Sequence, residues 1–201
     1  MNWQNINNSQ GTAEKDEKIS LVKSIFEWLE VIITAIIAVV VIFTFVFKVV
    51  TIEGGSMRET LHNGDKVIIS NMFYTPKQGD IVVVSRNIDN SVDEASSVPI
   101  IKRIIATQGQ TVDIDFEQGI VFVDGVALDE PYTRTPTNLK YDIEFPVLVS
   151  DGCVFVLGDN RNDSRDSRSS LIGDNGMIDT RYILGKAVLR FMPFDKFGGL
   201  S

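Results

Sequence analysis

Residues 31–47 read V-I-I-T-A-I-I-A-V-V-V-I-F-T-F-V-F and contain no charged side chain. With Trp28 and Leu29 before it and residues 49–52 after it, the run is long enough to cross a bilayer, which takes about 20 helical residues. Trp28 suits the interface between lipid and water. The run therefore predicts one transmembrane helix, which we place over residues 25–50.

Two other structures can contain an apolar run. A cleavable signal peptide has a shorter apolar core, and a cleavage site of small residues follows it. Here the run is long and continues into F-K-V-V-T-I-E at residues 47–53. A buried helix of a soluble protein normally has a polar face, and this run has none. Both observations favour a membrane anchor.

The flanks of the run define the domain organisation. Residues 1–24 are polar and rich in Asn, Gln, Ser, Glu and Lys, and they predict a short disordered tail. Residues 51–201 are expected to form the folded domain. The basic residues close to the run are balanced, with Lys15, Lys18 and Lys23 before it and Lys48, Arg58 and Lys66 after it. The positive-inside rule therefore does not orient the helix.

After the run, the sequence changes to short apolar stretches separated by turn signals. The dipeptide Asp124-Gly125 between V-F-V and V-A-L is typical of a two-residue β-hairpin. Asn63-Gly64-Asp65 and Gln78-Gly79-Asp80 indicate further turns, and residues 87–98 are expected to form a polar loop. No helical period persists. The domain is predicted to be mostly β. Its expected strands are V-I-I-S, D-I-V-V-V, I-I-K-R-I-I-A, I-V-F-V, V-F-V-L-G and A-V-L-R-F.

Composition excludes several kinds of function. Hydrophobic residues make up 44 % of the 201 positions, enough for a core. From Thr51 onward there are 15 Lys and Arg against 22 Asp and Glu, a balance of −7, which does not favour nucleic-acid binding. One cysteine, Cys153, and one histidine, His62, exclude an intrachain disulfide and nearly exclude a Cys/His zinc site. The neighbours of Cys153 indicate a buried strand and a core thiol.

Ser56 follows two glycines in the stretch T-I-E-G-G-S-M-R-E-T-L, residues 51–61. Glycines let a substrate backbone come close and leave backbone N–H groups available to a developing oxyanion. The stretch is therefore compatible with a nucleophilic serine. Taken alone, it more readily indicates a Gly-Gly-Ser turn that links the anchor to the domain.

A serine hydroxyl becomes a nucleophile when a base removes its proton. His62 lies in a turn only six residues further on, where a solvated side chain is the more ordinary outcome. Lys102 lies in P-I-I-K-R-I-I-A. In a strand it shares a face with Ile100 and Ile104, while Arg103 shares the other face with Ile101 and Ile105. One alternative is an edge strand with both charges in water. The other is a buried Lys102, whose pKa of about 10.4 burial lowers by up to about 3–5 units.

Residues 158–168 read G-D-N-R-N-D-S-R-D-S-R. Alternating acids, bases and hydroxyls directly after an apolar strand predict a network of ion pairs and hydrogen bonds, although a solvated loop has the same composition. Asp159, Asp166, Arg161 and Arg168 could hold a lysine-bearing strand in place. Ser164 could form a hydrogen bond there.

These stretches resemble the type I signal peptidases of the short, single-anchor bacterial form, which are membrane serine proteases with a Ser–Lys dyad. Four segments carry the resemblance in the family's order: G-G-S-M-R-E-T-L, G-D-I-V-V, K-R-I-I-A-T-Q-G and G-D-N-R-N-D-S-R-D-S-R. V-D-G-V-A-L-D-E-P-Y and G-K-A-V-L-R-F-M-P-F also resemble family segments. The resemblance runs from the anchor to the C-terminus.

The resemblance assigns roles residue by residue. Ser56 matches the nucleophile, Lys102 the general base and Ser164 the serine that hydrogen-bonds the lysine. Gly54 stands where some members have an oxyanion-binding serine, so the backbone N–H of Ser56 would take that role. The family usually has proline where this chain has Glu59. The loop residues Asp159, Arg161, Asp166 and Arg168 match the supporting set, and Met57, Leu61 and Ile101 match residues that line shallow pockets for small side chains.

The resemblance also implies a fold and a function. The fold would be two antiparallel β-sheets after one N-terminal transmembrane helix, with an apolar surface that meets the bilayer. The function would be removal of signal peptides from exported preproteins after an Ala-x-Ala pattern, near the export machinery and at the outer face of the cytoplasmic membrane. Neither a metal nor a cofactor is implied, and the tail would lie in the cytoplasm.

Two alternatives remain open. Self-cleaving repressors share a Ser-Met motif and a similar β core, but they carry a DNA-binding domain where this chain has an anchor. A catalytically impaired protein that only binds signal peptides would share the whole fold. Glu59 is the one feature that favours this second alternative.

Overall fold

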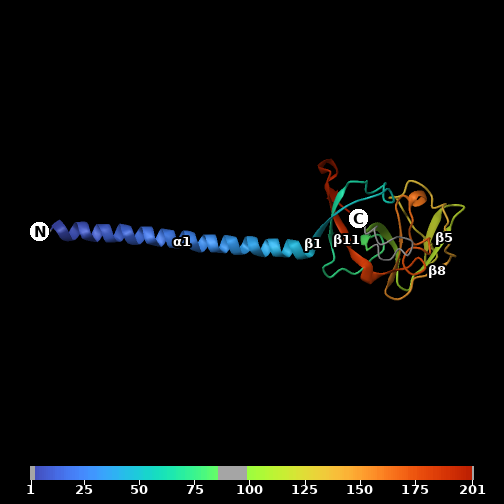
Figure 1. Ribbon diagram of the computed structural model, residues 1–201, viewed down its shortest axis with the longest axis horizontal. Coiled ribbons are helices and arrows are strands. Elements are labelled where there is room, and N and C mark those ends of the chain that lie inside the picture. Colours follow the sequence, from blue (N-terminus) through green and yellow to red (C-terminus); the bar gives the residue numbers. More distant parts are fainter. Residues whose placement is uncertain (1–2, 86–98, 201) are drawn as a thin grey trace. The chain divides into compact units, whose positions relative to one another are not determined.

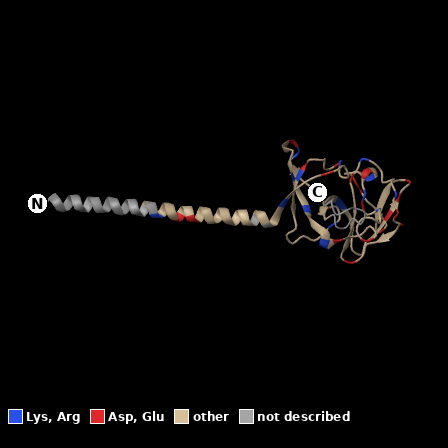
Figure 2. Ribbon diagram, viewed as in Figure 1, with Lys and Arg blue, Asp and Glu red and all other residues tan. Residues whose placement is uncertain are grey.

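The computed structural model describes residues 3–85 and 99–200. It contains two compact units, residues 1–45 and residues 46–201. The first consists of the helix α1, which spans Trp3–Val46 (Figure 1). Residues 23–41 form a 19-residue stretch of mean hydropathy 2.2, none of it buried within the protein. Figure 2 shows no charged residue on α1 after Glu30. By length and composition this helix can cross a membrane.

The bounds of α1 differ from the expected ones at both ends. The helix begins at Trp3, within the tail expected to be disordered, because extending an existing helix costs far less than starting one. It ends at Val46 rather than at residue 50, and Phe47–Thr51 form strand β1. This segment is rich in β-branched residues, which favour strands, and it pairs with β2.

The second unit contains a large antiparallel sheet of eight strands in the order β1-β2-β11-β3-β4-β9-β10, with β12 beside β11. The strands span β1 Phe47–Thr51, β2 Lys66–Ser70, β3 Ile81–Val84, β4 Ile100–Thr107, β9 Cys153–Leu157, β10 Ile178–Asp179, β11 Ile183–Met192 and β12 Gly198–Gly199. Three short 3₁₀ helices are also described: η2 Arg161–Asp163, η3 Thr180–Tyr182 and η4 Phe194–Lys196. Strand β4 lies between β3 and β9, so the edge-strand alternative for Lys102 is wrong.

A smaller antiparallel sheet has four strands in the order β7-β6-β5-β8. They span β5 Thr111–Asp115, β6 Ile120–Val123, β7 Val126–Ala127 and β8 Val147–Leu148. The hairpin predicted at Asp124-Gly125 is confirmed, because both residues have positive φ angles of 52° and 77° and join β6 to β7. Figure 1 shows β5 and β8 at the end of the domain opposite to β1 and β11. The predicted mostly-β fold of two antiparallel sheets is confirmed.

Both faces of β4 are buried. Ile104 belongs to one apolar cluster with Val82 and Val156, whereas Ile105 belongs to another with residues of the small sheet. This alternation follows from the two-residue period of a strand, and it holds Lys102 and Arg103 in the interior. Cys153 is half-buried at the start of β9 rather than fully in the core. The polar loop expected at residues 87–98 lies outside the described residues.

Candidate active site

Ser56 lies in a turn between β1 and β2 that a second loop holds in place. The backbone N–H of Asn160 donates to the Ser56 carbonyl at 2.9 Å, and the Asn160 side chain donates to the Gly55 carbonyl at 2.9 Å. Gly54 has a φ of 88°, a conformation that favours glycine, and its N–H donates to Asn63 at 3.0 Å. The turn is therefore fixed from two sides rather than being a flexible linker.

Lys102 reaches this turn from the middle of β4. Its Nζ lies 2.7 Å from Ser56 Oγ and also donates to the Ile101 carbonyl at 3.0 Å. The side chain is only 3 % exposed. His62, in contrast, is exposed in the turn before β2, where its backbone N–H donates to Asp65. The geometry thus brings a lysine, and not the histidine, to the serine.

Burial lowers the pKa of Lys102 from 10.5 to about 8, because a charged ammonium loses its hydration in the interior. Asp166 and Asp159 act in the opposite direction by favouring the ammonium, and Arg168 disfavours it. With a pKa of about 8, roughly one molecule in ten has a neutral amine at pH 7. A neutral amine can accept the proton of a serine hydroxyl in direct contact with it.

Arg103, the neighbour of Lys102, is locked on the other face of β4. Its guanidinium makes two hydrogen bonds of 2.9 Å with Asp159, and both side chains are buried. Thr60 also donates to Asp159. The ring of Tyr132 lies 3.9 Å from the guanidinium carbon, a cation–π contact. Asp159 therefore ties the serine turn, through Thr60, to the lysine strand, through Arg103.

Arg161 makes a second buried ion pair, with Glu130. It also donates to Thr137 at 2.7 Å and to the Gly158 carbonyl at 3.1 Å. The hydroxyl of Tyr132 donates to Glu130 at 2.9 Å. Residues 130–137 are thereby fastened to the loop that follows β9.

Asp166 and Arg168 form the third buried pair, at 2.8 Å. Asp166 also accepts from the Gly158 N–H at 3.0 Å, while Arg168 donates to the carbonyls of Leu139, Arg161 and Ser164. All four charged residues predicted for this loop are at most 1 % exposed. The predicted network exists, and the alternative of a solvated loop is wrong.

The hydrogen bond expected between Ser164 and Lys102 is not formed. The buried Ser164 Oγ has no hydrogen-bond partner among the described residues. It lies against Gly158, where an added Cβ would be 2.2 Å from Ser164 Oγ and 2.6 Å from the Ser56 carbonyl oxygen. Only glycine leaves room for both, so Gly158 is a packing requirement that the sequence analysis did not single out.

The residues expected to bind substrate lie in the core. Met57, Leu61 and Ile101 are 1 %, 0 % and 6 % exposed and belong to one apolar cluster. Their role in pockets for small side chains stays a prediction. Glu59 forms an ion pair of 2.7 Å with the exposed Arg134. The ionic contact of Glu59 is thus with Arg134 and not with Ser56 or Lys102.

Sequence reasoning missed the contacts of Asn160, Thr60, Glu130 and Tyr132. The segment containing Glu130 and Tyr132 was recognised as family-like, but no local pattern places a tyrosine ring over Arg103. Such contacts join positions far apart in the chain, and only the sheet order brings them together.

Comparison with known proteins agrees with this site and fold. Residues 25–192 match the family model described as "Signal peptidase, peptidase S26". The chain is 33 % identical to "Signal peptidase I S" of Bacillus subtilis (strain 168) over 193 residues, which cover 90 % of this chain and 97 % of the relative. It is 37 % identical to "Probable signal peptidase I-2" of Synechocystis sp. over 180 residues, covering 87 % and 78 %.

The chain belongs to the signal peptidase family, peptidase family S26. Within that family of serine proteases, the chain is a signal peptidase I, which is a peptide hydrolase. The family implies signal peptides as the substrates. The apolar helix α1 and this membership together indicate membrane anchoring.

Proposed function

We propose that this chain removes N-terminal signal peptides from exported preproteins by cutting after a small residue, with Ser56 as nucleophile and Lys102 as general base. The observation that carries the proposal is the buried Lys102 Nζ at 2.7 Å from Ser56 Oγ. A nucleophile and a base in direct contact, with the base kept partly neutral by burial, are what serine attack requires.

The reaction proceeds in two halves. Ser56 Oγ attacks the carbonyl after the small residue while Lys102 takes its proton, and the ammonium then protonates the leaving amine of the mature protein. Water, deprotonated by the neutral amine, then hydrolyses the ester on Ser56: the signal peptide leaves with a free carboxylate, and the ammonium returns its proton to Ser56 Oγ. The backbone N–H of Ser56 donates to no acceptor among the described residues, so it is free to stabilise the oxyanion.

Anchoring serves this reaction. A preprotein's signal peptide carries its own apolar segment, and confinement of enzyme and substrate to one bilayer raises their effective concentration. We place the tail in the cytoplasm and the catalytic domain outside the cytoplasmic membrane, where exported preproteins emerge. Glu59, the one feature that favours the impaired-enzyme alternative, pairs with Arg134 rather than with a reacting group, and this supports the active enzyme.

The direct test is cleavage of a model preprotein by the full-length chain in detergent, followed by N-terminal sequencing of the product. We expect a single new N-terminus, one residue after the last Ala of an Ala-x-Ala pattern. Preproteins with a bulky residue in place of that Ala are the control and should remain uncut. Binding of the preprotein without cleavage would support the impaired-enzyme alternative instead.

The pH dependence of cleavage should follow the titration of Lys102. The amine is active only when neutral, and its pKa lies at about 8. We therefore expect kcat/KM to fall about tenfold per pH unit below this value and to level off above it. Measurement between roughly pH 5 and pH 9, with circular dichroism at each pH to confirm folding, tests this. A rate that stays constant across that range would contradict a lysine base.

A further inference from the structure

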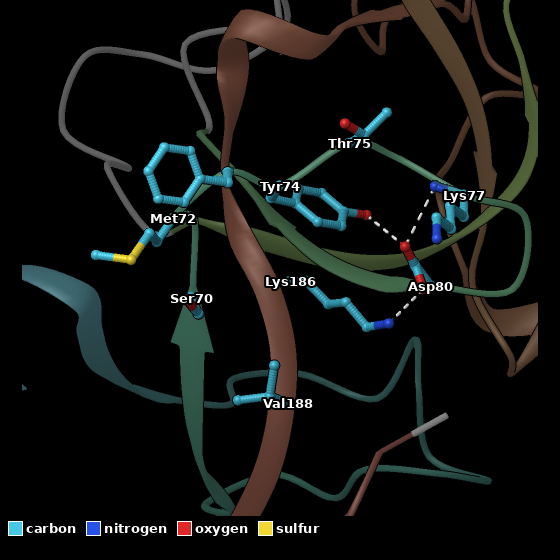
Figure 3. Close-up of a pocket in the computed structure, with 9 residues that line it drawn as sticks. Ser70, Met72, Tyr74, Thr75, Lys77, Asp80, Lys186 and Val188 are labelled. Carbon is cyan, nitrogen blue, oxygen red and sulfur yellow. Dashed lines mark hydrogen bonds and ion pairs between the residues drawn. The ribbon is translucent and has the colours of Figure 1, made fainter.

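A pocket of about 350 Å³ opens between the segment that follows β2 and the strand β11. Neither Ser56 nor Lys102 lines it. Its lining includes Ser70, Met72, Tyr74, Lys77, Asp80 and Lys186. Figure 3 shows Tyr74, Lys77 and Lys186 converging on the carboxylate of Asp80. None of these residues has a part in the proposed chemistry.

Chain connectivity keeps this pocket close to the bilayer. Ser70 pairs with Phe47, the residue directly after α1, and the uncharged apolar run that begins at Val31 continues to Phe47. Ser70, in the wall of the pocket, is therefore paired with the residue at which the apolar run ends.

The rim of the pocket is apolar and exposed. Phe73 is 96 % exposed and Met72 is 54 % exposed, and both directly follow the end of β2. Phe73 has a φ of 51°, an unfavourable conformation for an aromatic residue. A fully exposed aromatic ring is unfavourable in water, whereas the interfacial region of a membrane accommodates it.

The pocket carries a positive balance in an acidic domain. Asp80 accepts from Lys186 at 2.6 Å, from the Tyr74 hydroxyl at 2.8 Å and from the Lys77 backbone N–H at 3.2 Å, so its oxygens are occupied. Burial, and then Asp80, raise the pKa of Tyr74, which keeps the hydroxyl neutral and donating. An ammonium has three donors, and Lys186 gives one to Asp80. The exposed Lys77 side chain adds a second cation.

We propose that this pocket binds the phosphate of an anionic phospholipid, with Lys186 and Lys77 as the phosphate ligands and Phe73 and Met72 in the acyl region beneath the headgroup. Asp80 is the positioning residue that holds Lys186 in place. The proposal rests on the membrane anchoring in the proposed function, but not on its chemistry. The two cations explain a preference for a charged headgroup, and the exposed rim explains a preference for a lipid over a soluble phosphate.

The test counts lipids retained by the full-length chain. The chain in detergent micelles is titrated with phosphatidylglycerol or phosphatidylcholine and analysed by native mass spectrometry in ammonium acetate of about 1 M, where the Debye length is about 3 Å. We expect one phosphatidylglycerol to bind more tightly than phosphatidylcholine. Lys77→Gln and Lys186→Gln should each weaken the binding of phosphatidylglycerol by about tenfold, which is the effect expected from losing one hydrogen bond to a charged group.

Lys48→Gln is the matched control. Lys48 is an exposed lysine on β1 next to Phe47, but it pairs with Ile69 and so projects from the opposite face to Ser70. This variant should retain wild-type binding. Asparagine tolerates the left-handed backbone conformation of residue 73. The variant Phe73→Asn should weaken the binding of phosphatidylglycerol and of phosphatidylcholine alike.

Three results would overturn the proposal: equal retention of the two lipids by the wild type, wild-type retention by both pocket variants, or soluble glycerol phosphate binding as tightly as phosphatidylglycerol. The last would identify a site for soluble phosphate. Ser56→Ala should bind the lipid normally, and the two pocket variants should cleave a preprotein normally in lipid-free detergent. Failure of the lipid site and failure of the proposed catalysis are thereby distinguished.

Discussion

Lys102→Met is expected to reduce cleavage of a model preprotein by about 10⁴-fold or more, to the background rate. Methionine has a similar length and shape but cannot accept a proton, so the Ser56 hydroxyl loses the base that lies 2.7 Å away. Ser56→Ala should have an equally large effect because it removes the attacking atom. When two residues act together in one chemical step, the effects of substituting them do not add. The double variant should therefore be no slower than either single variant.

Folding of these variants separates a chemical effect from a structural one. Lys102 is a buried amine with a pKa lowered to about 8, so its burial is unfavourable whenever it is protonated. Lys102→Met should therefore melt at or above the wild-type temperature at pH 6. Near-normal cleavage by either folded single variant would refute the assignment of nucleophile and base.

Asp159→Asn is expected to destabilise the domain by about 3–5 kcal/mol, because Arg103 would keep its buried charge without a counterion. Both side chains are at most 2 % exposed, and each partner contributes two hydrogen-bonding atoms. For a domain of about 150 residues this corresponds to roughly 10 °C in melting temperature. Cleavage should also fall, since Asp159 joins the serine turn to the lysine strand through Thr60 and Arg103.

Asp179→Asn is the matched control, with the same chemical change at an ion pair on the surface. Its partner Arg181 is 84 % exposed, and water solvates both charges when the pair is broken. The melting temperature should remain close to that of the wild type. Thermal unfolding followed by circular dichroism measures both variants, and equal, small shifts would mean that the Arg103–Asp159 pair does not hold the site together.

The fold was largely predictable because its signals are local. The apolar run defined the helix, and turn residues such as Asp124-Gly125 separated the strands of the domain. Alternation along β4 predicted opposite faces for Lys102 and Arg103, and the two side chains bind different partners, Ser56 and Asp159. The tail was less predictable, because residues 3–24 are helical only as an extension of the apolar helix.

The site was predictable in its charged residues but not in their connections. The dense alternation of acids and bases after β9 indicated a network, and burial of that network follows from the sheet order, which the sequence pattern alone does not specify. The contact of Tyr132 with Arg103 and that of Asn160 with Ser56 each join segments about 30 or 100 residues apart. No periodicity encodes such pairs.

Strand β1 has only five residues, Phe47–Thr51, and it is the sole link between the end of α1 and the turn that carries Ser56. Five extended residues reach about 17 Å, and Ser56 follows five residues after Thr51. The backbone between the end of α1 and Ser56 therefore sets an upper limit on the distance between the helix end and this serine. In the function proposed above, that limit would restrict how far from its apolar core a preprotein can carry its cleavage motif.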